Sequence, residues 1–306
     1  MNCQMAAWVI SEDPAAQAAL LAVETWMHTV EHALSRFRPD SELSKLNAAA
    51  GHPYPAGDVL WQVTQRALAA AKATDGLFDP TIGQDLVRAG YNRSFEQLSQ
   101  GPHEAEAPES AQNRASSWRD IQLDLERKTI TLPPGVRLDL GGIAKGWAAE
   151  RALAMLRPFG PAMVDAGGDL AIGDPPPNQK GWSVAIADPL SPEDDLVALS
   201  LANCGLATSG TDHRRWRHRG RMQHHIVDPH QHQPAHTDIL TATVIAPTAT
   251  EADVLALAMV VMGLAKADAW LQRHENIPTL LVLNDGRTYQ NPTFTHYVQA
   301  YFPIYA

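Results

Sequence analysis

The sequence predicts an α+β protein in which a helical N-terminal part packs on an antiparallel or mixed sheet. Apolar residues recur with helical spacing near the N-terminus, whereas later segments alternate with a period of two. Helices and strands then mix without regular βαβ alternation, which favours α+β over a doubly wound sheet. The chain has 306 residues, of which 45% are hydrophobic and 19% charged. Because this is ordinary globular usage, we expect a folded, soluble chain.

Two early stretches carry the spacing of amphipathic helices. Over residues 13–37 large apolar side chains recur every three or four positions, and residues 58–74 repeat the pattern before an Asp75–Gly76 turn. Residues 101–117 then contain no large apolar side chain, so burial cannot offset their ordering entropy. We predict a flexible connection there, within a single domain over residues 1–306.

After this segment the pattern becomes that of strands. Residues 121–125, 129–132 and 136–140 alternate apolar and polar side chains, which predicts an antiparallel meander. Helical spacing returns over residues 145–156 and 251–262. Short strand-like runs occupy residues 162–165, 182–186, 197–201, 240–245 and 279–283.

The net charge and the two cysteines limit which binding partners and which cellular compartment we expect for this protein. Lys and Arg number 24 against 34 Asp and Glu, and the net charge of -10 argues against a nucleic-acid or anionic-membrane surface. Cys3 and Cys204 can form neither a disulfide framework nor a CxxC site. No window approaches the roughly 18 apolar residues of a membrane helix, and the N-terminus shows no export signal or lipoprotein pattern. We therefore expect a cytoplasmic protein without a membrane span or nucleic-acid partner.

The most informative stretch is residues 138–146, Leu-Asp-Leu-Gly-Gly-Ile-Ala-Lys-Gly. The pattern predicts a strand that runs into two glycines and then a helix, where free backbone N–H groups can approach an anion. Lys145 adds a positive charge, and Asp139 can accept from a ligand hydroxyl or base edge. The order matches neither GxxxxGK[ST] nor GxGxxG. A nucleotide-binding role and a purely structural turn are therefore equally open for this stretch. A second glycine pair, within residues 165–169, is a weaker indication of a ligand site.

Histidines concentrate in one segment. Seven of the 13 lie between His213 and His236, beside five arginines. This cluster is compatible with a zinc site, a basic nucleic-acid strip, or one catalytic histidine in a solvated hairpin. Prolines interrupt any strand there and no acidic partner follows closely, so the zinc site is disfavoured. Its ligands would be His230, His232 and His236.

Two further residues could carry chemistry. His225 precedes a short apolar pair and an Asp-Pro turn, a defined position in which a histidine can act as a general base near neutral pH. Asp253 lies near the start of the apolar helix expected over residues 251–262. It is either a favourable charge at the helix N-terminus or an oxygen ligand for a hard divalent cation. From the residues alone the first role is favoured.

Seven segments, in this order, resemble the FAD:protein FMN transferase family, the ApbE flavin transferases. Each motif alone is weak, but together they span almost the whole chain in register. The segments are SELSKLN (41–47), TDGLFDPTIG (74–83), LDLGGIAKG (138–146), VDAGGD (164–169), ATSG (207–210), HIVDP (225–229) and VIAPTATEAD (244–253), the last continuing to 263.

The resemblance implies an α+β enzyme of the ApbE type that uses Mg²⁺. Such an enzyme moves FMN from its substrate FAD onto a Thr or Ser hydroxyl of an acceptor protein and releases AMP. It implies nucleotide contacts for Asp139 and Lys145, and the role of catalytic base for His225. Metal ligands would be Asp253 and the backbone carbonyl of Gly142. The remaining implied flavin-nucleotide positions are Met5, Phe37, Leu77, Phe78 and Asp79.

One departure from the family pattern bears on the metal. The family usually places a Thr four residues after the metal-binding Asp, where this chain has Leu257, which offers no oxygen. Thr250, three residues before Asp253, can substitute only if the helix begins early enough. Two alternative functions follow: a flavin-binding or trafficking protein with weak or lost transfer, and an FAD pyrophosphatase that gives FMN and AMP. Family members are also often exported, unlike the compartment expected above.

Overall fold

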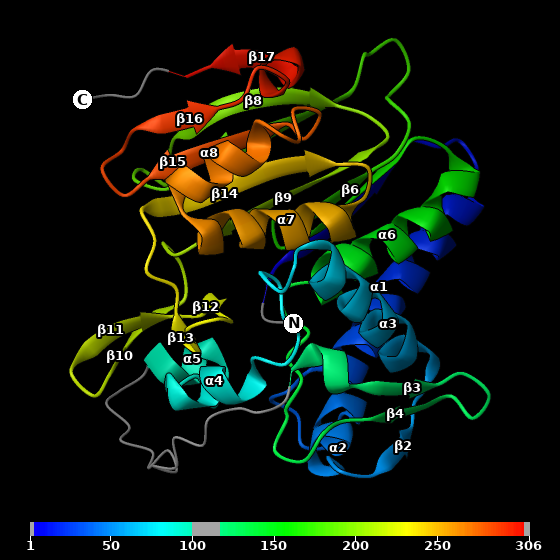
Figure 1. Cartoon of the computed structure of the whole chain (residues 1–306). Coiled ribbons are helices and arrows are strands. Elements are labelled where there is room, and N and C mark those ends of the chain that lie inside the picture. Colours follow the sequence, from blue (N-terminus) through cyan, green and yellow to red (C-terminus); the bar gives the residue numbers. More distant parts are fainter. Residues whose placement is uncertain (1–2, 100–116, 303–306) are drawn as a thin grey trace. The chain divides into compact units, whose positions relative to one another are not determined.

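The computed structural model describes residues 3–99 and 117–302, which gather in two units that interleave along the chain (Figure 1). Unit 1 contains residues 28–144 and 213–236, and unit 2 contains residues 3–27, 145–212 and 237–302. The expected α+β class is confirmed. The single domain over residues 1–306 stays a prediction, and the connection expected over 101–117 lies, apart from Ser117, outside the described residues.

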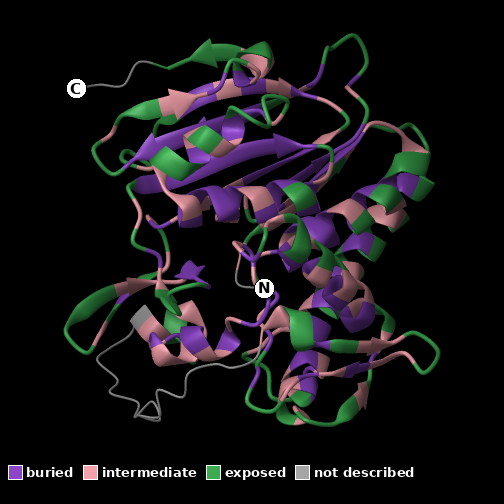
Figure 2. Cartoon of the chain, in the orientation of Figure 1, coloured by how far each residue is buried: buried purple, intermediate pink, exposed green. Residues whose placement is uncertain are grey.

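Unit 2 is built on a seven-stranded sheet in the order β1-β5-β6-β9-β14-β15-β16. Every neighbouring pair in it is antiparallel. Its strands are β1 (Met5–Val9), β5 (Ala162–Ala166), β6 (Leu170–Ile172), β9 (Cys204–Gly210), β14 (Ile239–Ala246), β15 (Thr279–Leu283) and β16 (Thr288–Gln290). The neighbouring strands β14 and β15 are buried at every residue, as Figure 2 shows, so both faces of the sheet are covered there.

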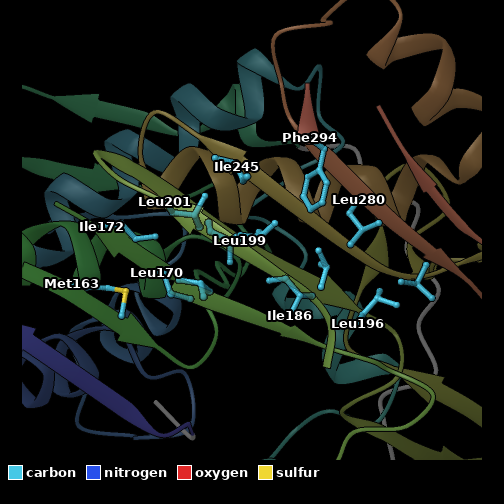
Figure 3. Close-up of a cluster of buried hydrophobic side chains, with 14 residues drawn as sticks. Met163, Leu170, Ile172, Ile186, Leu196, Leu199, Leu201, Ile245, Leu280 and Phe294 are labelled. Atoms are coloured by element: carbon cyan, nitrogen blue, oxygen red, sulfur yellow. The ribbon is translucent and has the colours of Figure 1, made fainter. Parts of the chain in front are cut away.

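A three-stranded sheet covers one of these faces. Its order is β17-β8-β7, with β7 (Trp182–Ala187), β8 (Asp195–Leu201) and β17 (Val298–Tyr301). Side chains from both sheets form one buried apolar cluster (Figure 3). It includes Leu199 of β8, Leu206 of β9, Ile245 of β14 and Phe294 of the 3₁₀ turn η3 (Phe294–Tyr297). Burial of each such side chain contributes about 1.5–3 kcal/mol.

Helices complete unit 2. Helix α7 (Ala249–Met262) packs on β9 and β14 and is followed by α8 (Leu264–Leu271). Because α7 is apolar on most of its circumference, it suits a buried position. The N-terminal part of α1 (Ala15–Leu34) packs on α6 (Ala144–Leu156), where Trp26 and Trp147 have ring centroids 5.4 Å apart.

Unit 1 holds short helices, a small sheet and two hairpins. Helix α2 begins after Ser41, whose buried hydroxyl accepts the Ser44 N–H at 3.0 Å. The sheet order is β2-β4-β3, and the hairpins are β10-β11 and β12-β13. The elements are α2 (Glu42–Ala48), α3 (Asp58–Ala73), α4 (Gly83–Arg88), α5 (Phe95–Ser99), η1 (Trp118–Asp120), β2 (Pro53–Pro55), β3 (Gln122–Asp124), β4 (Thr129–Thr131), β10 (Arg215–His218), β11 (Arg221–His224), β12 (Val227–Asp228) and β13 (Gln233–Pro234).

None of the helices in the described ranges is both long enough and apolar enough to cross a lipid bilayer. The expected cytoplasmic location stays a prediction.

The strand expected over residues 136–140 is wrong. The third strand of the small sheet is β2, and residues 136–140 form only an isolated bridge at Arg137. The Asn47 side chain takes the place of a strand partner, because it accepts the Leu138 N–H at 2.7 Å and donates to the Leu138 carbonyl at 3.0 Å. Pro80 then accepts the Asp139 N–H at 2.8 Å. The alternating pattern over residues 136–140 therefore reflects which side chains are buried, and not pairing with a neighbouring strand.

Replacing Asn47 with Ala should lower the free energy of unfolding by about 1–3 kcal/mol, because it leaves both polar groups of a buried backbone residue without partners. Urea unfolding followed by circular dichroism measures the change. The exposed Asn92 provides the control, since Asn92→Ala should stay within about 0.5 kcal/mol of the parent. Equal stability of Asn47→Ala and Asn92→Ala would contradict the role given to Asn47.

Candidate functional site

A buried pair of carboxyl groups lies in unit 2. Asp169, at the β6 end of the β5–β6 turn, and Asp253, in the first turns of α7, are 1% and 3% exposed and lie close enough for each carboxyl to shift the pKa of the other. Lys145, in the first turn of α6, forms an ion pair with Asp169. Burial raises the pKa of both carboxyls, and the neighbouring Asp169 charge helps to raise the pKa of Asp253 well above its ordinary value. The group therefore concentrates negative charge that a single lysine only partly offsets.

Two carboxylate oxygens of this group, and the hydroxyl of Thr250 three residues before Asp253 in α7, are of the kind that binds a hard divalent cation. Within the described residues, Asp169 Oδ1, Asp253 Oδ2 and Thr250 Oγ1 are buried and have no hydrogen-bond partner. Carboxylate and hydroxyl oxygens are the donors that Mg²⁺ and Ca²⁺ prefer. No group of three or more His, Cys, Asp or Glu side chains in the described ranges could hold a metal ion. The fit therefore rests on two carboxylates supplemented by neutral oxygens.

Local packing fixes the start of α7, which carries two of these oxygens. Thr248 caps the helix by accepting the Glu251 N–H at 3.2 Å, and Glu150 Oε1 of α6 accepts the Thr250 N–H at 2.7 Å. A Cβ at Gly146 would lie 2.5 Å from the Ala249 carbonyl oxygen, and one at Gly205 would lie 2.2 Å from the Ala249 nitrogen, in the preceding peptide group. Glycine at these two positions lets α6 and β9 approach the first turn closely.

Glu150→Ala should lower the free energy of unfolding by about 1.5–3 kcal/mol, because it removes a hydrogen bond to a charged acceptor. Glu150→Gln keeps an acceptor oxygen and should recover at least half of that loss. Urea unfolding at neutral pH compares the three proteins. If Gln and Ala behave alike, the bond to Thr250 does not anchor α7.

The second glycine pair forms the turn that places Asp169. Val164 and Asp165 pair with β6, and Gly167 and Gly168 both have positive φ, which suits a two-residue hairpin turn. Asp165 Oδ1 accepts the Gly168 N–H at 2.7 Å and so stabilises the turn. Met5, an implied flavin position, lies opposite Ala166 on the neighbouring strand.

The glycine turn before α6 belongs to unit 1. Asp139, which precedes this turn, forms an ion pair with Arg36. Asp139 Oδ2 pairs with Arg36 Nε at 2.6 Å, and its Oδ1 accepts the Gly141 N–H at 2.8 Å. These bonds orient the turn that contains Gly142. The polypeptide then continues into Lys145 and the rest of α6, so the motif over residues 138–146 contributes residues to both units.

Arg36 was not singled out by its sequence pattern. Its guanidinium carbon lies 4.1 Å from the Phe37 ring centroid and 4.4 Å from that of Tyr91. Burial lowers the pKa of Arg36, although Asp139 opposes the shift. Phe37, the implied flavin residue, is 37% exposed and therefore keeps part of its ring accessible beside this cation.

The implied triplet Leu77, Phe78 and Asp79 lies between α3 and α4. Phe78 is 3% exposed, so its side chain belongs to the interior of unit 1. Asp79 Oδ1 accepts the Thr81 N–H at 2.7 Å and thereby shapes the approach to α4. Leu77 and Asp79 are half-buried.

His225 lies between β11 and β12, and the hairpin around it is ordered by Asp228. The Asp228 carboxylate accepts the His230 N–H at 2.8 Å and the Gln231 side-chain amide at 2.8 Å. His225 itself is half-buried, consistent with a defined position rather than a loop tip.

The three histidines considered for zinc have other environments. All three are exposed, and His232 Nδ1 lies 3.1 Å from the buried Asp85 carboxylate. Asp85 comes from α4, so the acidic partner missing from the local sequence is supplied by a distant segment.

The structure brings Lys145 and Asp253, which the sequence pointed to, together with Asp169, while Glu150 bonds the backbone of Thr250 one turn before Asp253. Asp169 appeared in the sequence only as one end of a glycine turn. The Asp-Ala-Gly-Gly-Asp stretch over residues 165–169 was the available signal, but no sequence spacing links Asp169 to Asp253. Glu150 lay inside a helix with no distinguishing pattern.

Comparisons with known proteins cover most of the chain. Residues 1–281 match the ApbE family. An FAD:protein FMN transferase from Treponema pallidum (strain Nichols) is 33% identical over 301 residues, covering 91% of this chain and 81% of that protein. An FAD:protein FMN transferase from Klebsiella pneumoniae (strain 342) is 28% identical over 264 residues, covering 82% and 78%.

Solved structures agree with the sequence matches. The ApbE protein of Thermotoga maritima superposes with a TM-score of 0.82 at 28% identity, over 95% of this chain and 94% of that chain. Flavin transferase ApbE from Vibrio cholerae gives a TM-score of 0.79 over 97% and 96%, and at 23% identity this likeness concerns the fold alone.

Proposed function

The chain belongs to the ApbE family, as its motifs indicated, and from this premise we propose that it transfers FMN from FAD to a Thr or Ser hydroxyl of an acceptor protein. AMP is the second product. The observation that carries the proposal is the buried Asp169–Asp253 pair, whose oxygens without partners in the described residues could hold a divalent cation. A transferase acting on a pyrophosphate requires such positive charge to balance the negative charge of its substrate.

In the proposed reaction the acceptor hydroxyl oxygen attacks the phosphorus on the FMN side of the pyrophosphate. The phosphorus–oxygen bond to the AMP phosphate breaks, and the AMP phosphate leaves with the bond electrons. His225 takes the hydroxyl proton, as a half-buried histidine at a fixed position can do near neutral pH. The acceptor oxygen thereby becomes the ester oxygen of protein-bound FMN.

Asp253 would hold Mg²⁺, with the Gly142 carbonyl as the second ligand that the family resemblance implies. When bound, the ion neutralises charge on the pyrophosphate as the bond to the leaving phosphate breaks. Thr250 and Asp169 provide further oxygens beside Asp253. Lys145 offsets part of the negative charge of the acidic pair.

The remaining implied residues would bind FAD. Asp139, held by Arg36, offers a fixed carboxylate, and the partly exposed Phe37 ring can stack on an aromatic ring system. Met5, Leu77, Phe78 and Asp79 complete the proposed set. Since Phe78 is almost fully buried, we assign it to shaping the site rather than to broad contact with the ligand.

A transfer assay tests the proposal. The protein is mixed with FAD, an acceptor protein or peptide with a candidate Thr or Ser, and either Mg²⁺ or EDTA. Flavin fluorescence that stays on the denatured acceptor, with one AMP released per flavin bound, is expected only with Mg²⁺. FMN and AMP formed without labelled acceptor would instead support the pyrophosphatase, and bound FAD without either product would support a flavin-binding protein.

A further inference from the structure

The hydroxyl group of Thr250 is buried without a hydrogen-bond partner in the described part of the chain. The residue is 8% exposed, and its Oγ1 has no hydrogen-bond partner among the described residues. A helical Thr commonly bonds back to a carbonyl one turn earlier, and a buried hydroxyl without a partner costs about 1–3 kcal/mol. A valine of the same shape would avoid that cost.

Thr250 and Asp253 lie on the same helix, α7, three residues apart. Helix α7 begins at Ala249 after the Thr248 cap, so Thr250 lies within its first turn. Residues three apart lie on the same face of a helix, which places Thr250 one turn before Asp253. Asp253 Oδ2 is likewise buried and unpartnered within the described part of the chain. Two oxygens on one face of α7 thus have no hydrogen-bond partner in residues 3–99 and 117–302.

The backbone of Thr250 is fixed independently of its hydroxyl. Glu150 accepts its N–H at 2.7 Å, and Thr248 provides the helix cap. The hydroxyl is therefore not needed to begin the helix. At the equivalent position one turn after Asp253, Leu257 has no oxygen to offer.

We propose that Thr250 Oγ1 is the hydroxyl ligand of the divalent cation held by Asp253, and that it supplies from the preceding turn the oxygen that Leu257 lacks. This inference rests on the metal dependence of the proposed function. It assigns the ligand to a residue of this chain that the family pattern does not mark. The early start of α7 is the structural condition that makes it possible.

Manganese binding to the protein without FAD tests the assignment, because the electron paramagnetic resonance signal of free Mn²⁺ gives the dissociation constant directly. Thr250→Val keeps the side-chain shape and should weaken Mn²⁺ binding at least tenfold, the lower end of what even outer-shell losses cause. Thr250→Ser keeps the oxygen and should bind within about threefold of the parent. Thermal unfolding in EDTA should show that Thr250→Val is at least as stable as the parent, since an unpartnered buried oxygen is removed.

Thr64→Val is the matched control. Thr64 in α3 is fully buried, and among the residues that the structure describes its Oγ1 has no hydrogen-bond partner either. Because Thr64 belongs to unit 1, its replacement should leave Mn²⁺ affinity unchanged. Adding Leu257→Thr to Thr250→Val should restore binding to within about threefold of the parent, because an oxygen returns one turn away.

The outcomes separate this inference from the proposed function. If the parent binds Mn²⁺ and Thr250→Val binds equally well, Thr250 is not a ligand, whereas the metal-dependent function stands. If the parent binds no Mn²⁺ with or without FAD, both are overturned. Weakened binding in Thr250→Val alone, with recovery in the double variant, establishes the assignment.

Discussion

His225→Ala should reduce the rate of FMN transfer by about 10²–10⁴-fold, the contribution typical of a positioned general base, while FAD affinity stays within about twofold. The hydroxyl of a Thr or Ser is a weak nucleophile, so its attack depends on proton removal. His225 is half-buried beside β12, where the Asp228 turn orders the chain. Single-turnover transfer measured from acceptor fluorescence gives the rate, and titration of FAD fluorescence gives the affinity.

The neighbouring hairpin supplies a control for His225. His230 is exposed at the adjacent turn, so His230→Ala should transfer FMN at the parent rate. A zinc site built on His230 would instead lose activity in this variant and show bound zinc in the parent. Undiminished transfer by His225→Ala would remove this residue from the mechanism. A loss of FAD binding in the same variant would reassign it to substrate binding.

Asp253→Asn should abolish metal-dependent transfer and yet make the metal-free protein more stable. The substitution removes a ligand with negative charge, so Mg²⁺ binding and transfer are lost together. In the absence of metal it also removes one of two adjacent buried carboxyls, whose charges are costly at neutral pH. A gain of about 1 kcal/mol would raise Tm by roughly 2–4 °C in a domain of 150–250 residues.

The pH dependence of stability follows from the raised pKa values of Asp169 and Asp253. Both carboxyls bind protons more tightly in the folded state, so folding is favoured by protonation. Their favourable contribution is complete below the unfolded-state pKa and is lost as pH rises through the higher folded-state values. In EDTA, the parent should therefore lose stability over this range, and Asp253→Asn should lose less.

Thermal unfolding in EDTA at several pH values measures this second prediction. Glu251→Gln is the control, because Glu251 is an exposed carboxylate in the first turn of the same helix. It should leave transfer intact and lower stability by only about 0.3–1 kcal/mol through the helix dipole. If Asp253→Asn instead lowers the stability of the metal-free protein and retains transfer, Asp253 has the helix-terminal role first favoured by its sequence position.

Helices and long strands were predictable because their patterns are local. The spacing over residues 13–37 and 58–74 anticipated α1 and α3, and the apolar runs anticipated β14, β15 and α7. The error at residues 136–140 has a specific origin. Alternation records which side chains are buried, and Asn47, almost a hundred residues earlier, supplies the hydrogen bonds that a neighbouring strand normally provides.

In the candidate site, too, local patterns were predictable and long-range contacts were not. Lys145, Asp253 and His225 could be singled out because charge, glycine and proline near them form local patterns. Asp169 and Glu150 could not, since their roles depend on contacts with residues far along the chain. Arg36 is another such case, because its pairing with Asp139 joins segments that the sequence leaves unconnected.

By itself the sequence determined the α+β class, the order of most elements and the resemblance to a flavin transferase family. These properties depend on periodicity and on motifs within short windows. Only the tertiary structure decided that Asp169 meets Asp253, that α7 begins early enough to include Thr250, and that the hydroxyl of Thr250 has no partner in the described residues. Burial and hydrogen bonding are set by the folded chain as a whole, so the chemistry available to a carboxyl or hydroxyl emerges only when distant segments pack together.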